Sequence, residues 1–141
     1  MVEERDTKEV DVSSSGASTP IPDGTYPTDP PPDQTLLEVH FNRKKHRIKL
    51  DFGDKPLIVG RGDEDFPVAV DMTPFDAREN GVSREHAHFT RNESGVFVED
   101  NSSTNGTRIN GATLHTDRAY RLRNGDEIEF GTLRTVIRFI R

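Results

Sequence analysis

The chain has 141 residues, of which 30% are hydrophobic, 31% are charged and 7% are aromatic, so its length and composition fit one domain of ordinary size. Its 25 acidic and 19 basic residues give a formal net charge of -6, and the absence of cysteine excludes disulfides, a thiolate nucleophile and a cysteine-built zinc site. The N-terminus lacks the basic start and apolar stretch of a signal peptide, and no run approaches the roughly 18 apolar residues of a membrane span. We therefore expect a cytoplasmic protein that has no membrane partner.

Residues 1–34 differ in composition from the rest of the chain. They hold eight acids, two bases and six of the nine prolines, but none of the eight phenylalanines. Such a segment has too few apolar side chains to offset the entropy of ordering, so we predict a disordered tail and place the domain at residues 35–141. The hydroxyl residues of the tail are either part of a solubilising linker or kinase targets, with Thr7, Thr19 and Thr25 as candidate phosphosites.

Charge is balanced in the predicted domain, which carries seventeen acids and seventeen bases. A surface that binds nucleic acid needs net positive charge to displace counterions from the phosphates. We therefore expect no nucleic-acid partner.

The domain shows the sequence period of β-strands from its first residues. Apolar and polar residues alternate in 36–41 and again in 48–52, so each is predicted as a strand with one face in water, where Glu38 and His40 would lie. Further strands are expected at 57–59, 68–70, 87–90, 96–99, 107–109, 119–122, 127–130 and 133–139.

Turn-forming residues separate these segments. The runs 92–95, 110–111 and 124–126 contain the Asn, Asp and Gly residues that tolerate positive φ in tight hairpin connections. No segment shows a convincing helical period. We predict an all-β protein, an antiparallel β-sandwich of about eleven strands.

Three loops are unusually polar for connections in such a sandwich. The first loop begins at Gly60-Arg61, the second contains residues 81–87, and the third contains residues 100–107. Together they offer arginine forks, hydroxyls, an amide and glycine-exposed backbone N–H groups. These groups are suited to holding a phosphate dianion and an extended peptide, and no carboxylate has to take part.

The motifs in these loops resemble those of the forkhead-associated (FHA) domain family, in particular the small bacterial-type FHA proteins. Five elements fit in order and spacing over residues 57–131: Gly60-Arg61, Ser83-Arg84-Glu85-His86, Ser103-Thr104-Asn105-Gly106-Thr107, Asn110-Gly111 and Asn124-Gly125-Asp126. The segment 71–80, before Gly81, is longer than in many members of the family.

The resemblance implies a module that binds phosphothreonine peptides through its end loops. Arg61 is expected to clamp phosphate oxygens, because a guanidinium fork matches their geometry. Ser83 is expected to add its hydroxyl and backbone N–H, and Arg84 a second positive charge. Thr104 and Asn105 are expected to contact the peptide.

Other motif residues are expected to shape the loops. His86 would tie its loop to neighbouring backbone, and Gly106 would supply an unusual backbone conformation. In the family, the loop before the conserved serine often contacts the third residue after the phosphothreonine, and Gly81-Val82 leads us to expect an apolar preference there. The full set of expected structural residues is Gly60, His86, Gly106, Asn110, Gly111, Gly125 and Asp126.

Three alternatives compete with phosphothreonine binding. The same fold could bind an unmodified protein surface. Ser83 and His86 could form a hydrolase pair, but no carboxylate orienter is identifiable and no Gly-x-Ser-x-Gly elbow is present, so we expect no enzyme and no cofactor. His86 and His88 could bind a metal, but no third ligand follows at a plausible spacing, so no metal site is expected.

The expected function is therefore phosphothreonine-dependent protein binding in serine/threonine kinase signalling. The expected partners are phosphothreonine-containing proteins, the kinase itself, and the chain's own tail once it is phosphorylated. A tail that occupied its own domain's pocket would regulate the module.

Overall fold

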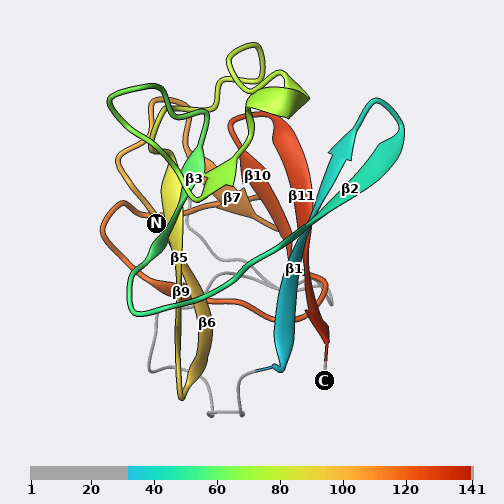
Figure 1. The fold of residues 1–141 in the computed structure, drawn as a ribbon, viewed down its shortest axis with the longest axis vertical. Coiled ribbons are helices and arrows are strands. Elements are labelled where there is room, and N and C mark those ends of the chain that lie inside the picture. Colours follow the sequence, from blue (N-terminus) through green and yellow to red (C-terminus); the bar gives the residue numbers. More distant parts are fainter. Residues whose placement is uncertain (1–31, 141) are drawn as a thin grey trace.

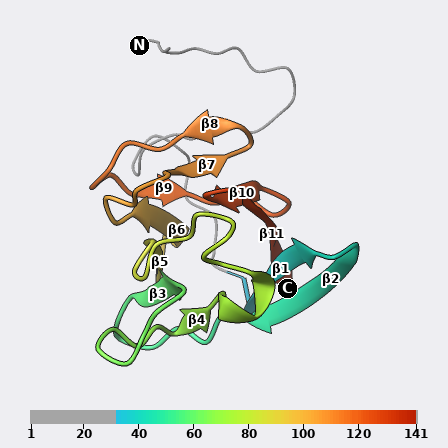
Figure 2. The same cartoon turned by 90° about the horizontal axis from the view of Figure 1, so that it is seen from above.

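The computed structural model describes residues 32–140, and in this range the chain forms two β-sheets that pack face to face (Figures 1 and 2). One sheet has the order β2-β1-β11-β10-β7-β8, and the other has the order β4-β3-β5-β6-β9. The elements are β1 (Gln34–Phe41), β2 (Lys44–Lys49), β3 (Leu57–Gly60), β4 (Val70–Asp71), the 3-10 helix η2 (Thr73–Phe75), β5 (Ala87–Asn92), β6 (Gly95–Asp100), β7 (Thr107–Ile109), β8 (Ala112–Thr113), β9 (Tyr120–Arg121), β10 (Glu127–Phe130) and β11 (Leu133–Ile140). The predicted all-β sandwich is confirmed.

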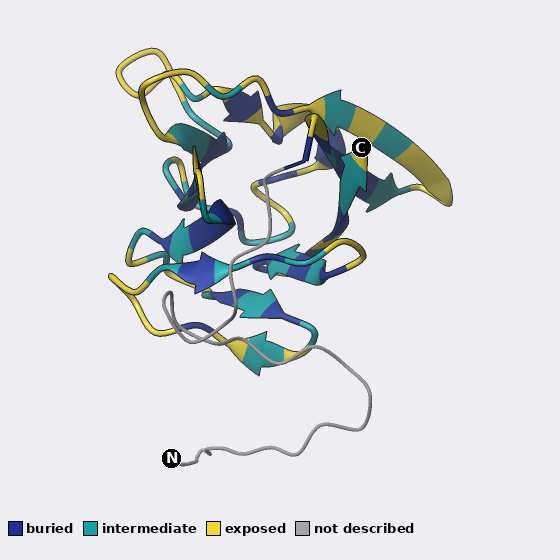
Figure 3. Cartoon of the chain, turned by 90° about the horizontal axis from the view of Figure 1, so that it is seen from below, coloured by how far each residue is buried: buried dark blue, intermediate teal, exposed yellow. Residues whose placement is uncertain are grey.

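The hydrophobic core lies between the two sheets. Phe89 on β5 pairs with Val98 on β6, and the Phe89 ring packs edge-on against Phe130 of the other sheet, with ring centroids 6.2 Å apart. In the six-stranded sheet Leu37 lies opposite Ile137. Each of these residues is at most 1% exposed, and Figure 3 shows the buried positions of the strands. Because a slip of one residue would turn these side chains to solvent, their burial fixes the register of the strands.

The structure corrects the predicted strands in three places. The β3–β4 pair is parallel, with Val59 opposite Val70, so the sandwich is not antiparallel throughout. The second strand, β2, begins at Lys44 because the chain turns at Asn42 and Arg43, with φ of 54° and 62°, so it starts four residues before the predicted segment 48–52 and ends at Lys49. The short strand β8 was not predicted.

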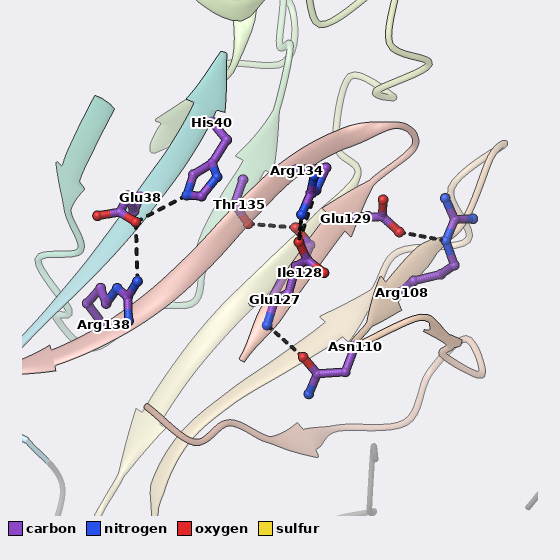
Figure 4. A network of polar contacts seen from close by, with 10 residues as sticks. All are labelled: Glu38, His40, Arg108, Asn110, Glu127, Ile128, Glu129, Arg134, Thr135 and Arg138. Atoms are coloured by element: carbon purple, nitrogen blue, oxygen red, sulfur yellow. Dashed lines mark hydrogen bonds and ion pairs between the residues drawn. The ribbon is translucent and has the colours of Figure 1, made fainter. Parts of the chain in front are cut away.

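Glu38 is buried, although the alternating pattern placed it on a face in water. It is 3% exposed and lies on the outer side of the six-stranded sheet, 3.1 Å from His40 Nε2 and 3.5 Å from Arg138 Nη2 (Figure 4). Burial raises the pKa of Glu38, but the contacts with His40 and Arg138 outweigh it and hold the pKa below its usual value. Long cationic side chains on the same face thus cover this carboxylate.

The start of the described chain is joined to β5. Pro32 is buried and its carbonyl accepts a hydrogen bond from Arg91 Nη2 at 3.2 Å. The candidate phosphosites Thr7, Thr19 and Thr25 lie outside the described residues. Residues 32–140 include no helix that is long and apolar enough to cross a membrane, and no group of three or more side chains placed to bind a metal ion.

Candidate functional site

The three predicted polar loops meet at one end of the sandwich, the upper end in Figure 1. The backbone N–H of Arg61, directly after β3, donates to the Ser83 carbonyl at 3.1 Å, and the N–H of Gly62 donates to the Arg84 carbonyl at 3.0 Å. The N–H of Thr104, in the β6–β7 loop, donates to Ser83 Oγ at 3.2 Å. Ser83 therefore joins the other two loops to its own.

Gly60 makes this meeting possible because it leaves room for backbone. A Cβ atom at this position would lie 2.1 Å from the Arg84 carbonyl oxygen and 2.7 Å from that of Ser83. Both oxygens are backbone atoms of the loop that carries Ser83, so they cannot move aside as the end of a flexible side chain could.

Arg61 is half-buried and held by its inner nitrogen. Its Nε donates to the Val82 carbonyl at 3.1 Å, while its terminal nitrogens have no hydrogen-bond or ion-pair partner within residues 32–140. The guanidinium is thus oriented by backbone, and its terminal fork remains available to a phosphate.

Ser83 offers less than the motif suggested. Its backbone N–H donates to His86 Nδ1 at 2.9 Å, so this N–H is already used inside the loop. Its hydroxyl oxygen accepts from Thr104, which leaves the hydroxyl hydrogen to donate. The expectation that Ser83 supplies both its N–H and its hydroxyl needs correction, since only the hydroxyl remains.

His86 is fully buried and links two of the loops. Because its Nδ1 accepts from Ser83, its Nε2 carries the hydrogen and donates to the Gly106 carbonyl at 2.9 Å. Burial lowers the pKa of His86, and the opposing effects of the Gly106 carbonyl and Asp100 are smaller. The ring also packs edge-on against Phe130, with centroids 5.7 Å apart. The neutral form of His86 is therefore the one that makes both of these hydrogen bonds.

Arg84 is ion-paired. Its Nη1 lies 3.2 Å from Asp63 Oδ2, and its guanidinium lies over the Phe66 ring, 4.6 Å from the centroid. Partial burial acts to raise the pKa of Asp63. The hydrogen bonds from Arg84 and from the backbone of Phe66 and Asp65 have the larger, opposite effect, so the pKa lies below its usual value. The second cation is present at the site, but a carboxylate partly balances its charge.

Asp100 organises the β6–β7 loop, and sequence reasoning did not single it out. It is 3% exposed, and its Oδ1 accepts from Ser103 Oγ at 2.6 Å and from Thr107 Oγ1 at 2.7 Å. Ser103 Oγ in turn accepts from the Gly106 N–H at 3.0 Å. The signal was in the sequence, because an aspartate three residues before a serine is typical of a side-chain-capped turn.

Asn105 contacts the Ser83 loop and lines a cavity that opens beside it. Its Nδ2 donates to the Gly81 carbonyl at 3.0 Å, and its Oδ1 has no partner among the described residues. The cavity beyond it has a volume of about 380 Å³ and is lined by Glu79, Asn80, Gly81, Asn105, Arg108, Gly131 and Thr132. Val82, on which the expected apolar preference depended, is only 2% exposed and lies in the core.

The remaining motif residues lie at the other end of β10. Asn110 Nδ2 donates to Asp126 Oδ1 at 3.1 Å, and Asn110 Oδ1 accepts from the Glu127 N–H at 2.9 Å. Gly111 and Gly125 have φ of 87° and 90°, and a Cβ on either would meet nothing within 4 Å. These residues form turns and do not reach the three polar loops.

The long segment before Gly81 is anchored to the fold. Met72 N donates to the Gly60 carbonyl at 2.8 Å, and Phe75 packs against Phe41 and His46, with ring centroids 5.8 and 5.1 Å away. Asn80 holds the other end of the segment to Thr132. The additional residues thus brace the loop that carries Ser83.

Comparison with known proteins agrees with this arrangement. The family model of the FHA domain matches residues 57–131, and the chain belongs to the FHA-domain family. FraH from Nostoc sp. is 33% identical over 107 residues, which are 72% of this chain and 37% of FraH, so this chain spans little more than a third of that relative.

Solved structures show the same fold. The FHA domain of CT664 from Chlamydia trachomatis matches with a TM-score of 0.60 at 24% identity, over 77% of this chain and 100% of that one. The MEK1 FHA domain in complex with a phosphothreonine peptide of HOP1 matches with a TM-score of 0.54 at 28% identity, over 74% of this chain and 95% of that one. FHA domains are binding modules, and the expected resemblance to bacterial FHA proteins is confirmed.

Proposed function

We propose that this domain binds phosphothreonine segments of other proteins at the meeting point of its three polar loops, in cytoplasmic serine/threonine kinase signalling. The observation that carries the proposal is the set of groups that the fold orients but leaves unused. These are the terminal fork of Arg61, the hydroxyl hydrogen of Ser83 and the Oδ1 of Asn105. A phosphate near pH 7 carries a charge of about -1.5 to -2 and three acceptor oxygens, which match the first two groups.

The test is a titration of the full chain with one peptide in phosphothreonine, phosphoserine and unphosphorylated forms. The phosphothreonine peptide should bind at micromolar concentration and the unphosphorylated peptide should not. Arg61→Ala should weaken binding about 30- to 150-fold, because a charge-assisted phosphate contact is worth roughly 2–3 kcal/mol. Arg118→Ala, which removes an exposed arginine in the β8–β9 loop, is the matched control. Equal affinity for phosphorylated and unphosphorylated peptides would favour binding of an unmodified surface instead.

A hydrolase reaction is not favoured by the geometry. General-base catalysis would require a ring nitrogen of His86 that can accept the Ser83 hydroxyl proton. The Nδ1 lone pair already accepts from the Ser83 N–H, and Nε2 donates to the Gly106 carbonyl. His86 therefore acts as a structural link in this proposal.

The cavity beside Asn105 supports contact with residues that follow the phosphothreonine. Arg108 Nε lies 3.0 Å from Glu129 Oε1, so its charge is largely balanced, whereas Glu79 has no partner within residues 32–140. A lone carboxylate at the cavity favours a basic or hydrogen-bond-donating side chain over the apolar one expected from the sequence. An oriented phosphothreonine peptide library will show which class is selected, and Glu79→Gln should abolish a basic preference.

Regulation by the N-terminal segment is the second part of the proposal. Phosphorylated Thr19, or alternatively Thr7 or Thr25, would occupy the site of its own chain, because tethering raises the effective concentration to about millimolar. The test is to phosphorylate the full chain with a serine/threonine kinase and record amide NMR shifts. Shifts around Arg61, Ser83 and Asn105 that persist on dilution support the proposal, and their absence contradicts it.

A further inference from the structure

Basic side chains are concentrated on the β1–β2 hairpin. Residues 39–50 contain five bases and no acid, whereas residues 51–141 contain sixteen acids and twelve bases. Residues 1–34 are also acidic, with eight acids and two bases. The five bases, here called the basic hairpin, are Arg43, Lys44, Lys45, Arg47 and Lys49. The domain is neutral as a whole because one positive segment, residues 39–50, offsets the net negative charge of its other residues.

The hairpin presents these charges on the outside of the molecule. β2 is the last strand of the six-stranded sheet, with only β1 beside it in the described chain, and the hairpin extends away from the body (Figures 1 and 3). All five basic side chains are exposed. The outer backbone edge of β2 is also free to pair with an extended chain, which makes the hairpin suited to a polypeptide ligand.

The fold neutralises little of this charge. Arg43 and Lys44 have no ion-pair partner within residues 32–140, and Arg47 lies 3.5 Å from Glu38. That same carboxylate lies 3.5 Å from Arg138, and its pKa is also lowered by Lys45. Lys49 Nζ lies 3.5 Å from the exposed Asp51 Oδ1. Two carboxylates therefore face five cations, one of them shared with Arg138, and the hairpin keeps an excess of positive charge.

An acidic polypeptide fits this surface better than a lipid bilayer. The rest of the chain is net negative, so an anionic membrane that attracted the hairpin would repel both flanking regions. The apolar residues of the hairpin, Phe41 and Ile48, are packed against the core and are not offered to lipid. In an extended acidic chain, the carboxylates can pair with the basic side chains of the hairpin. The backbone of that chain can form hydrogen bonds with the free edge of β2.

We propose that the basic hairpin is the docking surface for the acidic segment Glu3–Asp11 of the same chain. This segment carries five acids and two bases. The contact requires neither phosphorylation nor the phosphate-binding loops, so it stands apart from the function proposed above.

The connection between the segment and the domain is long enough. Asp11 and Pro32 are 21 residues apart, which can extend to about 70 Å, whereas the eight-residue β1 that leads to the hairpin spans about 26 Å. Tethering gives the segment an effective concentration of about millimolar at the hairpin. Because His46 packs 5.1 Å from Phe75 of η2, a docked segment would lie beside the loop that leads to Ser83.

The test uses the absence of cysteine in the chain. Thr7→Cys supplies a single attachment point for a nitroxide spin label in the full-length protein, and amide NMR signals near the label lose intensity. A docked segment should broaden the amides of residues 42–49. A segment held only by its attachment should instead broaden amides around Pro32 and Arg91, at the other end of β1.

Two matched charge reversals identify the surface. Lys44→Glu with Lys45→Glu should restore the signals of residues 42–49, whereas Lys55→Glu with Arg118→Glu makes the same change in charge elsewhere and should leave the broadening intact. All four side chains are exposed, so their replacement should not disturb the core. Salt at 1 M, where the Debye length is about 3 Å, should also restore the signals.

Three results would overturn the proposal. The first is broadening confined to the surroundings of Pro32 and Arg91. The second is broadening that appears only between a labelled and a separate isotope-enriched chain, which would assign the hairpin to a second copy. The third is sedimentation with phosphatidylserine vesicles that depends on Lys44 and Lys45, together with unbroadened hairpin signals, which would assign it to a membrane.

Discussion

The two groups of motif residues, one at each end of the sandwich, use glycine and asparagine for different purposes. At the three-loop end, Gly60 leaves space for the backbone of the Ser83 loop. At the other end, Gly111 and Gly125 adopt positive φ in turns with open space around them. The amide of Asn105 keeps one oxygen unused, whereas Asn110 uses both ends of its amide inside the protein. Similar motif residues therefore leave polar groups without a partner in the described chain at one end and close a turn at the other.

The largest expected effect is that of a methyl group at Gly60. Gly60→Ala places a Cβ 2.1 Å from a backbone oxygen, so we expect a loss of about 3 kcal/mol or more in unfolding free energy and a loss of peptide binding. Gly111→Ala has space but keeps a positive φ, and should cost about 1–2 kcal/mol with unchanged binding. Urea unfolding and peptide titration of both variants check this. Equal losses in the two variants would contradict the comparison.

The next effect concerns Asp100, which supports the β6–β7 loop. Asp100→Asn replaces an acceptor-only group by an amide facing the hydroxyls of Ser103 and Thr107, and should cost about 2–3 kcal/mol. Burial acts to raise the pKa of Asp100. The hydrogen bonds from Ser103 and Thr107 have the larger, opposite effect, so the pKa lies below its usual value. Its stabilisation is therefore present at neutral pH and is lost as the pH falls below about 4. Thermal unfolding across pH, with exposed Glu93→Gln as control, measures this.

A smaller effect is expected at the opposite end. Asn110→Ala removes the contacts with Asp126 and with the Glu127 N–H, and should lower the unfolding free energy by about 1–2 kcal/mol. The affinity for a phosphothreonine peptide should remain within twofold of the unaltered chain. A large loss of affinity in a folded Asn110→Ala variant would show that the two ends are coupled.

The smallest effect is the pH dependence contributed by His86. Because its pKa is lowered from 6.5 in the fold, the unfolded chain binds a proton that the folded chain does not. Stability should therefore decrease as the pH falls below about 6.5. Unfolding curves between pH 7.5 and about 5.5 for the wild type and His86→Gln should show a flatter profile in the variant. Identical slopes would contradict this role.

The loops that carry the site could be predicted from the sequence because their motifs place specific groups next to one another. Gly60 directly follows one strand that the apolar pattern defines, and His86 directly precedes another, with Ser83 three residues before it, so their meeting could be anticipated. The use of the Ser83 N–H by His86 could not, since it depends on the direction of one ring within a packed loop. The burial of Val82, on whose accessibility the expected apolar preference depended, could not be predicted either, because burial depends on the opposite sheet.

The β1–β2 hairpin shows where the sequence pattern misleads. Glu38 alternates correctly with apolar neighbours, yet arginines from other strands cover it. The turn at Asn42-Arg43 contains no glycine, so it lacked the usual signal for positive φ. Contacts between strands that are distant in sequence, and unusual turn residues, are the two features that local patterns do not encode.

The contact between Asn80 and Thr132 has a consequence for the kinetics of binding. Asn80 Nδ2 donates to the carbonyls of Phe75 and Asp76, while its own carbonyl and side-chain oxygens accept from Thr132. Both walls of the cavity are thus joined before any ligand arrives. Association should then proceed at the rate of diffusional encounter without a slow ordering phase, and variants of the cavity should differ mainly in how long the complex lasts.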